Sequence, residues 1–373
     1  MARKAGWVRK YIVPGLMFQA IVISGGYGTG AELNTYFMKN GPAGGLLALL
    51  LVTFPLWALV CALTFELARA YRAYDYRSLF GRVLGRGWVL FEGCYFVMLL
   101  LVLAVITASS GVIGRETFGL PEPVGMLVVS GSIIALVLAG TRAVEGFLAF
   151  MGYALYGVYA VFLVLCWREF GGEIAHQLTA APVIGPRWAL DGARYALYNL
   201  GMIPAVLFSV RHAETRREAV LSGVLASAIA VVPAALLVLA MAGVYPAVLG
   251  METPVNTILA ALRSPVLSYA FQLTLFSTLI ETGAGLIKAV SDRFEGGIKG
   301  REAPSWLRPA VATACVLAGM AVSSLGLTAL IERYYGAVAW GFLAVYVVPM
   351  LTVGMWKLLR AKTRLGADTG RKG

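Results

Sequence analysis

Four glycines within six positions interrupt the first hydrophobic segment of the chain, which runs from residue 11 to about residue 37. The stretch over 24–32 reads Ser-Gly-Gly-Tyr-Gly-Thr-Gly-Ala-Glu. Each glycine in a helix interior costs roughly 1 kcal/mol relative to alanine. In a bilayer, an unwound turn is tolerated only where protein encloses it or where it lines a cavity. The pattern therefore predicts a broken helix; the alternative is that the glycines serve close helix packing.

The overall composition places the chain among membrane proteins. Of its 373 residues, 59% are hydrophobic and only 13% are charged, whereas soluble proteins carry about 25% charged residues. The net charge of +12 does not indicate a nucleic-acid partner, because the basic residues cluster between apolar runs, as membrane topology requires. The sequence has no nucleotide-binding loop, nucleophile elbow or Cys/His cluster, so we expect neither an enzyme nor an organic cofactor.

Hydropathy divides the chain into ten apolar segments that we interpret as membrane spans; a span needs about 20 residues, and the fourth segment is short. We expect an all-α polytopic membrane protein with one transmembrane domain over 1–373. Its spans cover about 11–37, 44–67, 88–113, 124–138, 144–166, 189–210, 219–244, 266–290, 309–325 and 329–359. The stretch 168–187 is read as a polar connection, and 253–262 as a short helix on the outer surface.

Lys and Arg are distributed unevenly over the connecting segments. With the N-terminus in the cytoplasm, 24 of the 31 Lys and Arg residues fall on the inner side. Because cytoplasmic loops are enriched in these residues, the bias supports ten spans with both termini inside.

Ten spans divide into two halves of five, and an odd number gives the halves opposite orientations in the membrane. We expect repeat one over about 9–168 and repeat two over about 189–360. The sixth span should then also be broken, and Asn199, Gly201 and Pro204 lie within six residues of it.

The eighth span carries Thr274, Ser277, Thr278 and Glu281 on one helix face. Hydroxyl and carbonyl oxygens can coordinate a small hard cation, although such hydroxyls also bond back to their own helix. Glu281, like Glu32 after the first-span glycines, is an acid inside a span. Such acids must be paired, solvated or protonated, and they usually mark function. We therefore consider both Glu32 and Glu281 as proton-coupling residues.

The ten spans, the 5+5 repeat and the glycine-rich break together resemble the LeuT fold of the amino acid–polyamine–organocation superfamily. The motif over 24–32 looks most like the YkvI-like family of bacterial membrane proteins within that superfamily. In the superfamily the first and sixth helices unwind at the substrate site.

The resemblance implies a set of binding residues. A sodium site would use the carbonyls of Ser24 and Tyr27 with Thr274, Ser277 and Thr278. The first sodium site of this fold needs an Asn where this chain has Ala31, which argues against that site. A substrate carboxylate would meet the N–H groups of Thr29 and Gly30. The expected substrate-binding residues are Gly25, Gly26, Tyr27, Gly28, Thr29, Gly30, Tyr198, Asn199 and Gly201.

These observations lead to a secondary active transporter working by alternating access. The expected substrate is a small organic solute, an amino acid or a related compound, coupled to Na⁺ or H⁺. The expected location is the bacterial cytoplasmic (inner) membrane. A ligand-sensing receptor without net transport, as in germinant receptors, is the alternative, and a passive channel is a third.

Overall fold

The computed structural model describes residues 6–23, 25–139, 141–180, 182–297, 304 and 306–360. In this part of the chain the regular structure is entirely helical. Seven helical stretches are long and apolar enough to cross a membrane: Pro42–Tyr71, Tyr76–Phe118, Glu122–Ala139, Ala154–Thr179, Arg216–Ala242, Pro265–Lys288 and Leu327–Arg360. Two shorter apolar helices, Val13–Val22 and Leu307–Ser323, accompany them. The all-α membrane fold is thereby confirmed, while the number of crossings stays a prediction.

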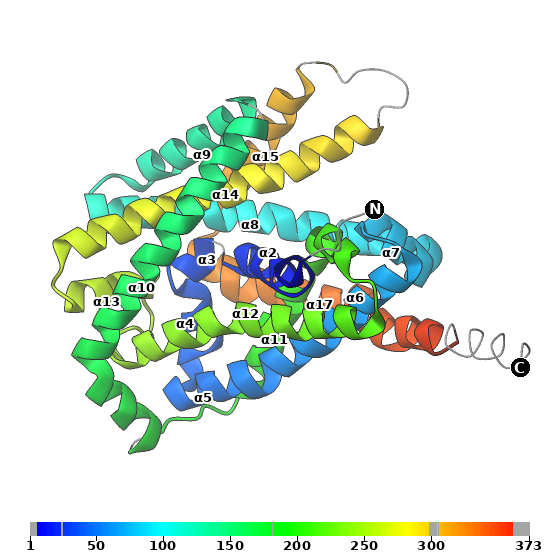
Figure 1. Ribbon diagram of the computed structural model, residues 1–373. Helices are drawn as coiled ribbons and strands as arrows, with labels where there is room; N and C mark the ends of the chain where they lie inside the picture. The colour runs from blue at the N-terminus through cyan, green and yellow to red at the C-terminus, as the bar shows by residue number, and fades with distance from the viewer. Residues whose placement is uncertain are drawn as a thin grey trace, which may run out of the picture.

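The first hydrophobic segment is broken, as predicted. It consists of α1 (Trp7–Tyr11), α2 (Val13–Val22), α3 (Gly25–Gly28) and α4 (Ala31–Tyr36). Helix α2 ends where Ile23 leaves the helical region at ψ 80°. Gly30 has φ +84°, a left-handed conformation that favours glycine. Figure 1 shows that α4 runs in a different direction from α2.

The rest of the first half is made of long helices with short connections. Its elements are η1 (Met38–Asn40), α5 (Pro42–Leu47), η2 (Ala48–Thr53), α6 (Phe54–Tyr71), α7 (Tyr76–Leu84), η3 (Gly85–Gly87), α8 (Trp88–Phe118), α9 (Glu122–Ala139) and α10 (Thr141–Thr179).

The polar stretch after Cys166 is not a connection, because α10 continues through it to Thr179. Its residues include good helix formers such as Glu173, Ala175 and Gln177. A helix can extend beyond the apolar layer, since internal hydrogen bonds satisfy its backbone along its length and water can satisfy the carbonyls left free at its end.

The sixth segment is broken as well. Helix α11 (Trp188–Leu200) ends at a turn formed by Gly201 and Met202, and the chain continues as a 3₁₀-helix, η4 (Ile203–His212). Pro204 has no backbone N–H and so cannot continue the α-helical ladder. The two predicted breaks are therefore present.

The second half continues with α12, a long helix, and a short helix, α13, before the eighth segment. Its elements are α12 (Arg216–Ala242), α13 (Pro254–Ala261), α14 (Pro265–Gly297), α15 (Leu307–Ser323), α16 (Leu327–Ala329), η5 (Leu330–Tyr335), α17 (Gly336–Phe342), η6 (Leu343–Val347) and η7 (Met350–Gly354).

Helix α13 is more than a surface helix. Its residues Pro254, Val255, Ile258 and Leu259 are buried. The N–H of Val255 donates to the carbonyl of Thr29 at 3.1 Å. The apolar face of α13 is therefore used to cover the first-helix break.

The helices pack in two groups with the break between them. One group contains α2, α6, η4 and α12; the other contains α8, α9, α14 and α15. Figure 1 shows α9, α14 and α15 together on one side and α2, α6 and α12 on the other. Helix α3 contacts α8 and α14, so the unwound backbone lies at the boundary between the groups.

Candidate functional site

Three backbone N–H groups of the first-helix break are bonded within the break itself. The N–H of Thr29 donates to the carbonyl of Gly25 at 3.2 Å, and the N–H of Gly30 donates to that of Tyr27 at 2.9 Å. The N–H of Ala31 donates to the Thr29 hydroxyl at 3.3 Å. The N–H groups proposed to meet a substrate carboxylate are thus already engaged in this structure. Ser24 lies outside the described residues.

The glycines of the break also permit close approach, so the two interpretations of the motif are compatible. A Cβ at Gly25 would lie 2.5 Å from Leu279 Cδ2, and one at Gly28 would meet Leu275. The break therefore rests against a leucine face of α14. This face differs from the hydroxyl face that the sequence suggested for an ion site.

Glu32 lies in the core, with 1% of its surface exposed. Its side chain folds back over the break, because a Cβ at Gly26 would lie 2.5 Å from Glu32 Oε1. The hydroxyl of Tyr198 donates to Glu32 Oε2 at 2.5 Å. This hydrogen bond joins the broken first helix to α11, which carries the second break.

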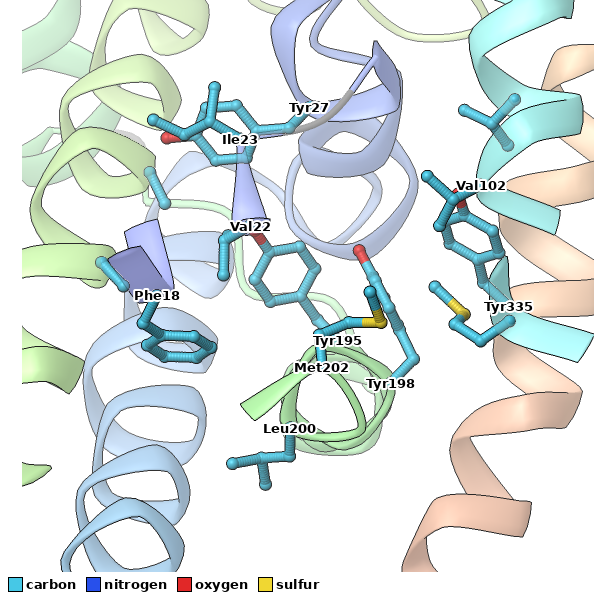
Figure 2. Close-up of a cluster of buried hydrophobic side chains, with 14 of the residues drawn as sticks. Phe18, Val22, Ile23, Tyr27, Val102, Tyr195, Tyr198, Leu200, Met202 and Tyr335 are labelled. Atoms are coloured by element: carbon cyan, nitrogen blue, oxygen red, sulfur yellow. The ribbon is translucent and has the colours of Figure 1, made fainter. Parts of the chain in front are cut away.

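Around Glu32 lies a group of four buried or nearly buried rings that we call the tyrosine cluster: Tyr36, Tyr195, Tyr198 and Tyr335. Its ring centroids are between 4.9 and 5.8 Å apart in the contacting pairs. The hydroxyl of Tyr36 donates to the carbonyl of Ile331 at 2.8 Å. Figure 2 shows Tyr195 and Tyr198 with their hydroxyls toward the segment that carries Val22 and Tyr27.

Several hydroxyls near the break have no hydrogen-bond partner among the described residues. Those of Tyr27, Tyr195 and Tyr335 are buried in this way. A buried hydroxyl without a hydrogen-bond partner costs folding free energy. A water molecule or a polar ligand group that bonded to these hydroxyls would therefore stabilise the protein.

On the α2 side of the tyrosine cluster lies a cavity of about 310 Å³, which we call the central cavity. Its lining comes from α2, α8, α11, η4, α14 and η5. The polar residues that line it are Tyr95, Tyr198, Asn199, Glu281, Thr282 and Tyr335, and the other lining residues are apolar or glycine.

On the α4 side lies a second, smaller pocket of about 190 Å³, the outer pocket. It is lined by Tyr36 and by charged residues, including Lys39, Asp191 and Glu332. Lys39 Nζ lies 2.9 Å from Glu332 Oε2. Since Tyr36 lines one pocket and Tyr198 and Tyr335 line the other, the tyrosine cluster separates the two.

The eighth-span hydroxyls donate to their own helix. Thr274 donates to Ala270 at 2.6 Å, Ser277 to Leu273 at 2.9 Å, and Thr278 to Thr274 at 3.0 Å. Each hydroxyl oxygen can still accept a bond or coordinate a cation. Within the described residues no group of three or more His, Cys, Asp or Glu could hold a metal ion.

The structure brings together Glu32 with Tyr198, and Glu281 with Tyr198 and Asn199 at the central cavity. Gly201 is close to Phe342, which a Cβ there would meet. The sequence interpretation did not include Tyr36, Tyr335, Tyr95 or Thr282. Tyrosine in a membrane protein usually suggests an interfacial anchor, whereas Thr282, four residues after Thr278, continues the i, i+4 spacing and could have been found from it.

No protein-family model matches the sequence, and no curated protein matches it significantly. Solved structures do resemble the fold. A manganese transporter of Eremococcus coleocola, in complex with an aromatic bis-isothiourea compound, is 18% identical with a TM-score of 0.53. The match covers 92% of this chain and 78% of that one.

Two further structures are similar. A Na⁺-coupled sialic acid symporter in a substrate-bound outward-open state is 13% identical, with a TM-score of 0.52; 93% of this chain and 87% of that one are covered. MhsT in complex with L-phenylalanine is 13% identical, with a TM-score of 0.57; the match covers 95% of this chain and 99% of that one. With its first and sixth segments broken, the chain has the LeuT fold.

Proposed function

We propose that this protein is a secondary active transporter that moves a small organic solute by alternating access. The observation that carries the proposal is the pair of cavities on opposite sides of the tyrosine cluster, between two broken helices. A thin layer of side chains separates them. Rocking of the α2, α6, η4 and α12 group against the other group would open one side while closing the other.

The substrate is proposed to be an amino acid or a related compound. The similarity to MhsT, whose structure holds L-phenylalanine, and to a sialic acid symporter supports a small organic solute. The described residues include no group of three or more His, Cys, Asp or Glu that could hold a divalent metal ion. This favours an organic substrate over manganese, the metal named for the Eremococcus coleocola transporter. Membership of the YkvI-like family and of the wider superfamily is part of the proposal.

Coupling is proposed to use either Na⁺ or H⁺. A proton would act on Glu32 or Glu281, and sodium would use the hydroxyls of Thr274, Ser277 and Thr278. The proposed setting is the bacterial inner membrane with both termini in the cytoplasm. The similarity to transporters, together with the lack of enzyme motifs in the sequence, supports a protein that is not an enzyme.

The test is uptake by purified protein in liposomes, with imposed Na⁺ and pH gradients and a library of labelled amino acids, amines and organic acids. A saturable accumulation that needs one of the gradients is the expected result. Binding without accumulation would support the receptor instead, and flux that neither saturates nor responds to gradients would support a channel.

Variants assign the coupling ion. Loss of the sodium dependence in Thr278→Ala is expected if sodium couples at the eighth segment. Loss of the pH dependence in Glu281→Gln is expected if protons couple there. If each variant keeps both dependences, the ion roles given to these residues are wrong.

A further inference from the structure

Among the described residues that line it, the central cavity has an acidic side chain and no basic one. Glu281 is the acid, and this part of the lining includes no Lys, Arg or His. Within the described residues no hydrogen bond or ion pair involves Glu281. A carboxylate in a mostly apolar cavity needs a proton or a cation. The cavity as built therefore complements positive charge.

The surrounding groups extend this complementarity. Tyr95, Tyr198 and Tyr335 line the same cavity, and aromatic faces attract cations. Asn199 donates its amide to the carbonyl of Tyr195 at 3.0 Å, which leaves its side-chain oxygen to accept a bond. Tyr198, Met202 and Tyr335, which Figure 2 labels, all line this cavity. Their side chains offer apolar surface that the apolar part of a ligand could contact.

Among the described residues, a carboxylate ligand finds neutral donors such as the Tyr335 hydroxyl, but no charged complement. The N–H groups of Thr29 and Gly30 are bonded within the break, and α4 has only six residues, with its first N–H donating to the Thr29 hydroxyl. Among the lining residues that the structure describes, an anion in the central cavity would meet the acid Glu281 and no side-chain cation.

The size and lining of the cavity favour an organic ion over a bare metal ion. Its volume of about 310 Å³ is near the lower end of ligand pockets, which hold about 300–1,000 Å³. Most of the lining is apolar or aromatic. A bare sodium ion would leave this surface unused.

We propose that the group recognised in the central cavity is a protonated amine, held by Glu281, Asn199 and the tyrosine faces, and that a carboxylate on the substrate is not required. This inference rests on the proposed function, because it narrows the class of solute that the transporter binds.

Three compounds that share a phenylethyl group and differ in their charged groups test the inference: phenethylamine, L-phenylalanine and 3-phenylpropionate. Isopentylamine, L-leucine and 4-methylvalerate form a second, aliphatic set. Binding is measured by calorimetry on the full chain in nanodiscs. An amine is expected to bind, its acid is not, and the amino acid is expected to bind no more tightly than the amine. The inference is overturned if no amine binds, or if an amino acid binds ten-fold more tightly than its amine.

Glu281→Gln should weaken amine binding at least ten-fold. Glu173→Gln, an exposed acid on α10, is the matched control and should leave binding unchanged. Unchanged amine affinity in folded Glu281→Gln would contradict the inference. If that variant does not fold, alkylation of Thr282→Cys provides a second measurement. Phenethylamine should slow the alkylation of this cysteine, and 3-phenylpropionate should not. Slower alkylation with 3-phenylpropionate but not with phenethylamine would refute the amine site.

The two proposals fail in different ways. If L-phenylalanine accumulates in vesicles while no amine binds or competes, transport stands and the amine site is wrong. If amines bind but no compound accumulates under any gradient, the amine site stands and transport is wrong.

Discussion

At the scale of single residues, the hydrogen bond between Tyr198 and Glu32 is the contact that defines the site. It joins residues 166 positions apart, at 2.5 Å, in the core. A carboxylate in such surroundings is stabilised by each donor that reaches it, and bonds to charged groups contribute more than neutral ones. The hydroxyl of Tyr198 therefore stabilises the fold by holding α11 to the broken first helix through Glu32.

Replacing this hydroxyl gives the first prediction. Tyr198→Phe keeps the ring and removes the donor, so we expect the free energy of unfolding to fall by about 1–3 kcal/mol, the cost of removing one partner of a buried hydrogen bond. The measurement is the apparent melting temperature in detergent. Tyr269→Phe, at an exposed position of α14, is the control. Equal melting temperatures for the two variants would show that the Tyr198 hydroxyl does not stabilise Glu32.

At the scale of elements, glycine sets how closely the helices pack. Helices α6 and α12 make the most extensive contact between elements. At Gly223 the two backbones are so close that a Cβ would lie 2.5 Å from the backbone nitrogen of Ala62 and 2.6 Å from its Cα. Neither backbone atom can move aside as a side chain can, so the pair behaves as one rigid unit of the α2, α6, η4 and α12 group.

The second prediction concerns this contact. Gly223→Ala should destabilise the protein by about 1–3 kcal/mol, the usual cost of overpacking a tight interface. Gly131→Ala on α9 is the matched control, because a Cβ there would meet nothing within 4 Å. There, alanine should be neutral or stabilising, since it favours the helix by roughly 0.5–1 kcal/mol. Thermal unfolding of both variants decides the matter; a stable Gly223→Ala protein would mean that the helices can move apart easily.

At the scale of the whole molecule, the two pockets lie on opposite sides of one closed layer. The central cavity is lined by Ala20 and Ile21, before the first break, and by Ala205, after the second. The outer pocket is lined by Thr35 and Lys39, beyond the first break. On the proposed orientation, with the N-terminus in the cytoplasm, the central cavity would belong to the cytoplasmic half of the protein.

This arrangement predicts opposite labelling from the two sides of the membrane. Thr282→Cys should react with an impermeant thiol reagent in inside-out vesicles, and Arg187→Cys should react in right-side-out cells. The four native cysteines are replaced first so that only the introduced thiol can react. Cys61, Cys166 and Cys315 are buried, but Cys94 is only partly buried. Labelling of Thr282→Cys from outside alone would reverse the orientation deduced from the Lys and Arg distribution.

The sequence by itself determined the membrane class and the two helix breaks. Apolar length, clustered glycine and the missing N–H of proline act locally, so Gly25 to Gly30 and Pro204 predict breaks without knowledge of any neighbour. The division into two repeats is deduced from the same local signals and stays a prediction.

Only the tertiary structure decided which side chains meet. Residues distant in sequence come together in the tyrosine cluster and in the hydrogen bond between Tyr198 and Glu32. The same holds for α13, which covers the first-helix break at Thr29. Likewise, the hydroxyl face of the eighth segment was visible in the sequence, but the leucines at 275 and 279 face the break. Periodicity shows which residues share a helix face, and the rotation and packing of the helix decide what that face contacts.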